Sequence, residues 1–465
     1  MSKHKSRRRA IKQLGLGLGA MAMGNPMLGE EPRMFELKPG EFPQFIPTQG
    51  KAVTAITLGA GARGNTYGNY AVAYPEELDI VGVAEPIPIR NERYAKLHDI
   101  KDEHRFVTWE HVFERPKFAD AIIITTPDDL HYGPCMQALE MGYDVLLEKP
   151  IAPTEQECRD ILELANRTGR IVAVCHVLRY APYFIRLREF IQSGKIGELI
   201  SIDHFEPIQH VHMAHSFVRG NWHNSVQTTP IILAKSCHDM DMMRWLVDKP
   251  CQELAAFGGL KWFRKENAPE GSTARCTDGC AVEGQCPYSA KKIYYRDRSW
   301  TYVFDFPDDK SKHGEFILEQ LRTTNYGRCV YRMENDQPDH YVCSLQFADD
   351  ITANFSMEAF TSYHGRRTRV MGAMGDIVGD MDEFVHTDFL TGTKTKWTLD
   401  QEEGKFSKTG HGGGDWALAH DWVKAVKLQD KSILTSTIDA SVESHIMAFR
   451  AERSRLNKTV EKVEL

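Results

Sequence analysis

Between residues 53 and 175 the chain alternates short apolar runs with longer amphipathic segments. The apolar runs indicate buried strands, whereas the amphipathic segments repeat their apolar residues at helical spacing. The predicted strands are 53–58, 78–84, 106–108, 120–127, 143–147 and 171–175, and the predicted helices are 88–97, 130–141 and 154–168. This alternation predicts an α/β domain with a doubly wound parallel sheet over residues 51–175.

After residue 196 the apolar positions recur with a period of two. Such alternation is typical of strands that bury one face only, in an antiparallel or mixed sheet. The predicted strands are 199–205, 300–306, 340–347, 351–357 and 367–371, and helical patterns cover 184–193, 416–426 and 441–453. We therefore predict a second α/β domain over residues 176–465, with the late helices packing back on the body.

The first strand ends in a glycine-rich turn, G-x-G-x-x-G, formed by Gly59, Gly61 and Gly64. In a dinucleotide-binding Rossmann domain these glycines permit a tight turn, admit the pyrophosphate and let the helix pack closely. Alone, the pattern also fits an ordinary glycine turn. Glu85, which ends the next strand, is suited to a ribose 2′-hydroxyl and would repel a 2′-phosphate, so we predict NAD, although Arg90 nearby leaves NADP open. The predicted cofactor site also includes Ala62 and Arg63.

The carboxyl ends of the predicted strands 120–127 and 143–147 are expected to line the same cofactor site. In an open parallel sheet, ligands lie beyond the carboxyl ends of the strands. Lys149 could be an ordinary solvated lysine, but Pro150 holds the backbone before it in an extended conformation. The residues of these two ends assigned to the cofactor are Thr125, Thr126, Pro127, Glu148 and Lys149.

Length, composition and charge narrow the class of protein. A chain of 465 residues is longer than a typical domain with a single hydrophobic core, so two domains are expected. Its 42% hydrophobic and 26% charged residues are typical of a folded globular protein. The formal net charge of −7 argues against a nucleic-acid partner. Beyond the first thirty residues no apolar run is long enough to span a bilayer, so no membrane partner is expected.

The first 28 residues have the layout of an export signal. Arg7, Arg8 and Arg9 precede Lys12 and a weakly apolar, glycine-rich stretch at 14–24. Paired arginines are typical of the twin-arginine type. We therefore predict a periplasmic or cell-envelope protein; the alternative is a disordered basic tail on a cytoplasmic one. Residues 29–50, rich in Pro and Gly, are predicted to be an arm or linker.

Five motifs between residues 52 and 250 follow the order and spacing of a known family. They are Gly59 to Gly64, Thr126-Pro127 with His131, 138–150 ending in Glu-Lys-Pro, 194–197, and 237–241. Together they resemble the Gfo/Idh/MocA oxidoreductase family, which includes glucose–fructose oxidoreductase and inositol dehydrogenase. The resemblance implies an NAD-binding Rossmann domain, a C-terminal α/β domain with a large open sheet, and homo-oligomers through that sheet. It also adds His131 to the cofactor site.

The same resemblance assigns two catalytic residues. Lys149 matches the lysine of the Glu-Lys-Pro motif, which contacts the reacting hydroxyl and the nicotinamide ribose, and His238 matches the acid/base histidine. Oxidation of an alcohol needs such a base and a cation that stabilises the developing alkoxide. Many members carry an acid four residues before the histidine, where this chain has Ala234, so Lys235 could take part in proton transfer. The alternative for His238 is a structural histidine in an apolar helix.

Other polar residues are candidates for binding the substrate. A histidine-rich stretch at 204–215 leads to a tryptophan whose ring can stack on a sugar. The substrate candidates are His176, Arg179, Tyr180, Trp222, Lys235 and His411. Asp415, just after His411, could instead cap a helix. A metal site at His210 and His212 lacks a second pair of ligands, so we predict none there.

Three of the ten cysteines lie close together, Cys276, Cys280 and Cys286. They fit a zinc site with a distant fourth ligand, a disulfide in an exported protein, or packed thiols, and these alternatives stay open. We commit to no metal. Cysteines in apolar patterns are expected in the core; these are Cys135, Cys158, Cys175 and Cys237.

The resemblance implies hydride transfer between nicotinamide and a carbohydrate carbon. We therefore predict an NAD-dependent oxidoreductase that acts on a secondary hydroxyl of a sugar or glycoside. Because free NAD is scarce outside the cytoplasm, we expect the cofactor to be retained between turnovers. One alternative is a glycoside-cleaving enzyme that oxidises the sugar transiently, eliminates the aglycone and re-reduces the product. A second is a non-catalytic nucleotide-binding sensor.

Overall fold

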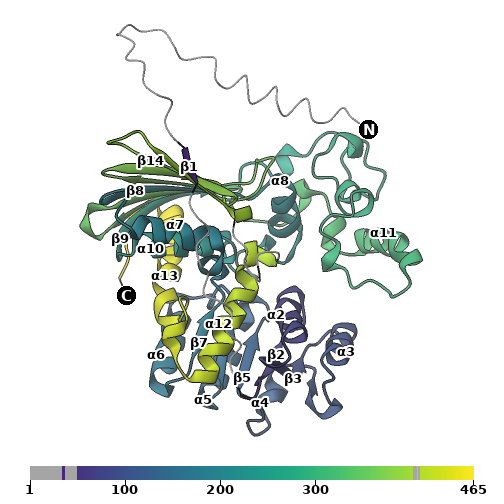
Figure 1. Cartoon of the computed structure of the whole chain (residues 1–465). Helices are drawn as coiled ribbons and strands as arrows, with labels where there is room; N and C mark the ends of the chain where they lie inside the picture. Colours follow the sequence, from purple (N-terminus) through teal and green to yellow (C-terminus); the bar gives the residue numbers. More distant parts are fainter. Residues whose placement is uncertain (1–33, 37–49, 402–405, 407–408, 465) are drawn as a thin grey trace.

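The computed structural model describes residues 34–36, 50–401, 406 and 409–464. The predicted export signal lies outside the described residues, and so does most of the predicted arm. The described chain forms two α/β units; of the two late helices, α12 (Gly414–Leu428) packs along the N-terminal unit and α13 (Ile438–Asn457) contacts both units (Figure 1). These helices pack on the body, as predicted.

The N-terminal unit is a parallel sheet of six strands with the order β4-β3-β2-β5-β6-β7. The strands are β2 (Val53–Leu58), β3 (Leu78–Ala84), β4 (Arg105–Phe106), β5 (Ala121–Ile124), β6 (Asp144–Leu147) and β7 (Val172–Val174). The strand order reverses between β2 and β5, and in this fold ligands bind in the crevice at the carboxyl ends beside such a reversal. The predicted doubly wound parallel sheet is confirmed.

Both faces of this sheet are buried, which explains its continuous apolar runs. Alternate residues of β2 and β5 enter two different cores, with Ile56 and Ile122 on one face and Ala55 and Ile123 on the other. The first face is covered by α5 (Tyr132–Glu140) and α6 (Glu155–Thr168), and the second by α2 (Ala62–Ala73), α3 (Pro88–Leu97) and the distant α12; a short α4 (Glu110–Phe113) follows β4.

Helix α6 is defined at both ends by local chemistry. The Thr154 hydroxyl accepts a hydrogen bond from the Glu157 N–H, and the Glu157 carboxylate accepts one from the Thr154 N–H. This capping box satisfies backbone donors that the first turn leaves unpaired. Gly169 ends the helix with a φ of +66°. The prediction of this helix from the sequence is confirmed.

The C-terminal unit is built on a mixed sheet of ten strands with the order β1-β15-β14-β13-β12-β8-β11-β10-β9-β16. Neighbours are antiparallel except for the β1–β15 and β8–β11 pairs. The strands are β1 (Met34–Glu36), β8 (Leu199–Pro207), β9 (Cys251–Gly259), β10 (His340–Phe347), β11 (Thr352–Glu358), β12 (Arg367–Gly372), β13 (Gly375–Gly379), β14 (Glu383–Asp388), β15 (Lys394–Thr398) and β16 (Val460–Lys462). The predicted large mixed sheet is confirmed.

Helices cover one face of the large sheet, and the other face is open (Figure 1). Along β10, buried and exposed side chains alternate, as the period of two predicted. The remaining helices of this unit are α7 (Pro182–Gln192), α8 (His210–His212), α9 (Ile231–Ala234), α10 (Cys237–Val247) and α11 (His313–Thr323). In the described part of the chain, no helix combines the length and apolarity needed to cross a membrane.

One predicted strand is wrong. Residues 300–306 belong to an insertion, residues 260–339, that connects β9 to β10 and carries α11 (Figure 1). Trp300 has a left-handed φ of +57°, and a short helical turn follows it. Phe304 packs instead into a small separate core with Tyr294 and Leu321. The alternating aromatic residues reflect packing inside this insertion rather than a place in a sheet.

Candidate functional site

The glycine turn between β2 and α2 has the geometry of a dinucleotide-binding loop. Gly59 has a φ of +91°, and a Cβ there would lie 2.6 Å from the Thr125 carbonyl oxygen. A Cβ on Gly64 would lie 2.2 Å from the Gly59 carbonyl oxygen. At Gly61, however, the nearest atom would be 3.9 Å away, on Arg90. The middle glycine thus leaves open space where a pyrophosphate approaches in this fold, so the residues fit the cofactor.

Glu85 supports this turn from the end of β3. Its buried carboxylate accepts hydrogen bonds from the Ala60 N–H at 2.8 Å and the Ile87 N–H at 2.9 Å. Each oxygen retains a lone pair, so the carboxylate can still accept a ribose hydroxyl. Thr125 braces the other side, since its hydroxyl donates to the Gly59 carbonyl oxygen at 2.6 Å.

His131 connects the two other strand ends predicted to line the cofactor site. Its Nδ1 lies 2.6 Å from the carbonyl oxygen of Pro150, and its Nε2 lies 3.0 Å from that of Thr126. The ring therefore holds the Thr126-Pro127 turn against the Glu148–Pro150 segment. His131 therefore supports the two turns through their backbone carbonyl groups. The sequence alone cannot separate this role from direct contact with the cofactor.

Arg63, in the first turn of α2, joins two buried carboxylates. Its guanidinium lies 2.5 Å from Glu148 Oε1 and 2.9 Å from Asp415 Oδ1. Burial alone would raise the pKa of Glu148, but the charges of Arg63 and Lys149 lower it below its ordinary value. In the same way, burial opposes the ionisation of Asp415, while His411 and Arg63 lower its pKa well below the usual range. Arg63 thus compensates the charges of Glu148 and Asp415, and its predicted contact with the cofactor stays a prediction.

Lys149 and His238 lie at the same place in the crevice. The Lys149 ammonium donates to the carbonyl oxygen of Ala234 at 2.7 Å, four residues before His238 on the neighbouring α10. Burial, followed by the charge of Lys149, lowers the pKa of His238 well below its ordinary value. His238 is 4% exposed, and its Nδ1 has no hydrogen-bond partner among the described residues.

A buried charge network lies beside this pair, and the sequence indicated only part of it. Lys235 Nζ lies 3.2 Å from Glu206, whose other oxygen lies 3.1 Å from Arg366. Arg366 also binds Asp239 at 2.6 Å, and His204 Nε2 lies 3.1 Å from the same carboxylate. Burial lowers the pKa of Lys235, and Glu206 opposes that shift. Asp239 lies in the 237–241 motif beside His238, whereas Arg366, just before β12, is distant in the sequence and no local motif revealed it.

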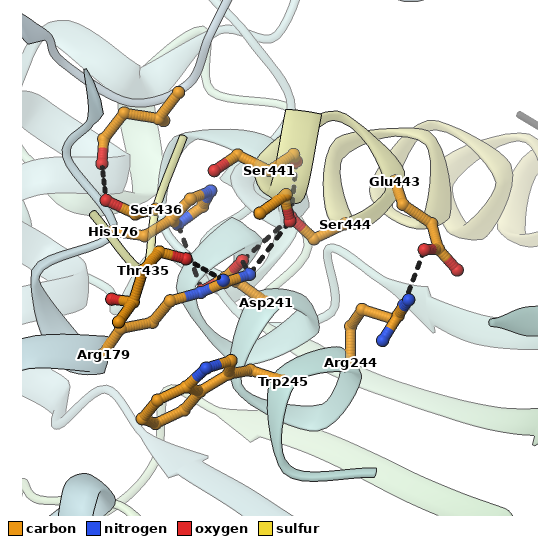
Figure 2. Close-up of polar contacts among 12 residues, drawn as sticks. His176, Arg179, Asp241, Arg244, Trp245, Thr435, Ser436, Ser441, Glu443 and Ser444 are labelled. Carbon is orange, nitrogen blue, oxygen red and sulfur yellow. Dashed lines mark hydrogen bonds and ion pairs between the residues drawn. The ribbon is translucent and has the colours of Figure 1, made fainter. Parts of the chain in front are cut away.

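Two residues predicted to bind the substrate, Arg179 and Tyr180, make structural contacts within the described chain. Figure 2 shows the Arg179 guanidinium on both oxygens of Asp241, at 2.6 and 2.8 Å. The same guanidinium binds backbone carbonyls near the start of α13. The Tyr180 hydroxyl hydrogen-bonds to Ser436 Oγ at 3.1 Å. Both side chains are buried and attach the segment before α13 to the N-terminal unit, and their assignment to the substrate stays a prediction.

His176 lies between this network and His238. It is fully buried, its ring centre is 6.0 Å from that of His238, and its Nδ1 is 3.7 Å from Asp241 (Figure 2). On its other side His445 accepts a hydrogen bond from the Ile151 N–H at 3.0 Å, just after the Glu-Lys-Pro motif. Burial lowers the pKa of His445 to about 3, which keeps it neutral.

Trp222 and His411 lie at the edges of the crevice. The Trp222 indole N–H donates to Asp128 at 2.9 Å, which ties the C-terminal unit to the turn after β5. His411 Nδ1 lies 3.0 Å from Asp415, and the ring centre of His411 is 5.9 Å from that of His238. The helix-capping alternative for Asp415 is wrong, because the N-cap of α12 is Gly413.

The histidine-rich stretch packs against aromatic rings of the insertion. His212 stacks on Trp300 at 4.6 Å, and His215 Nδ1 lies 2.7 Å from the Tyr294 hydroxyl. Burial lowers the pKa of His215 to about 3 and holds that of His212 well below its usual value. In the described residues, no group of three or more His, Cys, Asp or Glu side chains could hold a metal ion.

The ten cysteines are all free thiols. Cys276, Cys280 and Cys286 line one small cavity together with Cys329. The sulfur of Cys276 accepts hydrogen bonds from the Arg219 guanidinium at 3.8 Å and the Ala290 N–H at 3.4 Å. Of the three alternatives for this cluster, the described residues show packed thiols, with no disulfide and no grouping suited to a metal.

Comparison with known proteins defines the family. A model described as an oxidoreductase family with an NAD-binding Rossmann fold matches residues 54–176, and the model of its C-terminal alpha/beta domain matches residues 188–465. This chain belongs to the Gfo/Idh/MocA oxidoreductase family. It is therefore an oxidoreductase with an NAD-binding Rossmann domain, as the glycine turn and Glu85 predicted.

Individual relatives are distant. YteT of Bacillus subtilis is 27% identical over 318 residues, covering 65% of this chain and 71% of YteT. An inositol 2-dehydrogenase of Acidothermus cellulolyticus is 26% identical over 216 residues, which span 45% of this chain and 58% of that protein. The structure of a levoglucosan dehydrogenase with NADH and L-sorbose covers 89% of this chain and all of its own, with a TM-score of 0.65 at 16% identity, a likeness in fold.

Proposed function

We propose that this oxidoreductase transfers hydride between nicotinamide and a secondary hydroxyl carbon of a sugar or glycoside, forming a keto-sugar. The observation that carries the proposal is the common location of Lys149 and His238 beside the crevice that opens from the glycine turn. Relatives named for inositol and levoglucosan support a polyhydroxylated substrate.

His238 is assigned as the base. Its lowered pKa keeps the imidazole neutral near pH 7, and its Nδ1 lacks a partner among the described residues. A neutral ring can accept the proton of the substrate hydroxyl while the hydride leaves the same carbon. Bound NAD supplies the hydride acceptor. The ring of His176, packed at an edge-on angle behind His238, is assigned to position it.

Lys149 is assigned to stabilise the developing alkoxide. Among the described residues the Lys149 ammonium donates one hydrogen bond, to the Ala234 carbonyl oxygen, and two donors are left for the substrate oxygen and the cofactor ribose. A fixed cation beside the oxygen stabilises the transition state more than the neutral alcohol. Substrate hydroxyls are assigned to Trp222 and His411 and to Lys235 of the buried charge network.

We infer that the cofactor is retained between turnovers. The insertion, residues 260–339, docks on α3 next to the glycine turn, where Arg90 binds Asp305 at 2.9 Å. Arg93 binds Asp308 at 2.7 Å and the Phe306 carbonyl oxygen at 2.8 Å. A nucleotide bound at the turn would have to pass these contacts to leave, which slows its release.

One experiment tests the reaction and the retention together. The full chain is purified without added nucleotide; the ligand of one portion is extracted for mass spectrometry, and a second portion, with its ligand still bound, is incubated with a p-nitrophenyl glycoside. We expect NAD or NADH in the extract and a keto-glycoside in the reaction. Release of p-nitrophenol with unchanged cofactor would replace the proposal by the oxidation–elimination–reduction cycle. No turnover of glycosides or free sugars by NAD-loaded protein would favour a nucleotide sensor.

We also propose export through the twin-arginine route, based on the sequence of the first 28 residues. Replacing Arg8 and Arg9 by lysine should leave the protein in the cytoplasm of its host. The measurement is cell fractionation followed by N-terminal sequencing. An unprocessed N-terminus in the unmodified protein would exclude the proposal and favour the cytoplasmic alternative.

We further propose that the protein forms a homo-oligomer through the open face of its large sheet. Phe257, Val342 and Val378 are exposed on strands β9, β10 and β13 of this sheet. A second copy of the sheet would cover this mixed apolar and polar face. Light scattering should give a mass above that of one chain, and Val342→Glu should lower it. A monomeric unmodified protein would exclude the proposal.

A further inference from the structure

The insertion contributes a charged group next to the nucleotide-binding turn. Arg90, in the first turn of α3, donates from Nε to both carboxylate oxygens of Asp305, at 2.9 and 3.1 Å. Asp305 comes from the insertion, far from Arg90 in sequence. The two side chains are 29% and 32% exposed, so the pair lies at the rim of the site rather than in a core.

The guanidinium of this pair faces the site. Its Nη1 is the nearest atom to a Cβ placed on Gly61, 3.9 Å away. Arg90 is also close enough to Glu85 for that carboxylate to raise its pKa, although Asp305 contributes more. One cation and two carboxylates therefore surround the position next to β3 where the adenosine ribose lies in this fold.

We propose that Asp305 is a cofactor-specificity residue that acts by engaging Arg90. A free arginine at this position is well suited to a 2′-phosphate, because its fork of donors matches phosphate oxygens. With Asp305 bound to Nε, the guanidinium charge is compensated, and Glu85 and Asp305 together repel an added phosphate. The proposal rests on the nucleotide site described above and explains why a nearby arginine is compatible with NAD.

The chain offers a matched control in the same contact. Arg93 and Asp308 join the same helix to the same insertion at 2.7 Å. Their side chains are 45% and 97% exposed, and no contact links them to the glycine turn in the described residues. Removing the Asp308 carboxylate therefore weakens the docking of the insertion without changing the charges that surround the ribose.

The test compares affinities for two cofactors. NAD⁺ and NADP⁺ are titrated separately into ligand-stripped full-length protein, for the unmodified chain and for Asp305→Asn and Asp308→Asn. We expect Asp305→Asn to raise the affinity for NADP⁺ relative to NAD⁺ by about ten- to a hundredfold, the value of one charge-assisted hydrogen bond. Asp308→Asn should leave the ratio within about twofold, since an exposed ion pair contributes little.

A double variant identifies the group responsible. If Arg90 carries the new affinity, Asp305→Asn with Arg90→Ala should lose the gain for NADP⁺. An unchanged ratio in Asp305→Asn, or a gain that survives the loss of Arg90, would overturn the proposal. If Asp305→Asn fails to fold, Asp305→Glu, which keeps the charge, should fold and keep the preference for NAD⁺, and a switch to NADP⁺ in this variant would also overturn it. Failure of the unmodified chain to bind NAD⁺ would instead contradict the nucleotide site itself.

Discussion

The His238 end and the Arg90 end of the nucleotide site use similar residues in opposite ways. At the His238 end the side chains are buried, and Nδ1 of His238 and both ring nitrogens of His176 lack hydrogen-bond partners in the described structure. At the Arg90 end Glu85 is buried, Arg90 and Asp305 are partly exposed, and all three are hydrogen-bonded.

This difference agrees with the proposed roles of the two ends, the reaction at the His238 end and the discrimination between NAD and NADP at the Arg90 end. Unpartnered buried nitrogens are costly, so they are expected where a ligand or substrate completes the hydrogen bonding. Paired charges at the rim contribute little to stability, but they decide which added charge is tolerated. Four measurements test the roles proposed for the two ends.

Substitution of the unpartnered base should have the largest effect. His238→Asn is expected to lower kcat by about 10²–10⁴-fold, the usual contribution of a general base. The affinity for NAD should change little, because the proposed role of His238 is toward the substrate hydroxyl and not toward the nucleotide. Steady-state kinetics and fluorescence titration measure both.

The control for this variant is another buried histidine. His386 on β14 also has two ring nitrogens without partners among the described residues, but it lies in the large sheet. His386→Asn should keep kcat close to that of the unmodified protein. An equal loss of kcat in both variants would remove the distinction between the His238 end and any other buried histidine.

The second effect concerns stability. Arg63→Met would leave Glu148 and Asp415 as buried carboxylates without their shared cation, which is expected to cost about 3–5 kcal/mol. Arg93→Met breaks an exposed pair at the other end and should cost at most about 1 kcal/mol. Denaturant unfolding of both variants checks the comparison. Equal losses would show that burial does not separate these two ion pairs.

The third prediction concerns pH. Because burial and Lys149 lower the pKa of His238 in the folded protein, its ring stays neutral as the pH falls through 6.5, the ordinary value for histidine. The acid limb of kcat/KM should therefore lie below pH 6.5. A pH–rate profile of the unmodified protein provides the test, and a limb at or above 6.5 would contradict the assignment of His238 as the buried base.

The smallest effect is expected for Trp222, a partly buried side chain that donates one hydrogen bond. Trp222→Phe removes the donor to the Asp128 carboxylate and should raise KM for the sugar by about tenfold, the lower value for a hydrogen bond to a charged group. We expect kcat to stay within about twofold, because the indole takes no part in proton transfer. A loss of kcat comparable to that of His238→Asn would place Trp222 in the chemistry instead.

Features governed by neighbouring residues could be predicted from the sequence. The apolar runs of β2, β5 and β6, the glycine turn and the caps of α6 depend on residues a few positions apart, and all were confirmed. The period of two along β10 likewise predicted a sheet with one open face. The aromatic alternation at 300–306 failed, since the same period arises when rings pack inside an insertion.

The sequence by itself determined the strand pattern of the N-terminal unit, the dinucleotide-binding turn and the residue types available for catalysis. Only the tertiary structure decided which side chains meet: that Lys149 reaches the Ala234 carbonyl near His238, that Arg179 binds Asp241, and that Arg90 is engaged by Asp305. The physical reason is distance along the chain. Backbone preferences act within a few residues, whereas burial, charge compensation and hydrogen-bond partners depend on side chains brought together by folding.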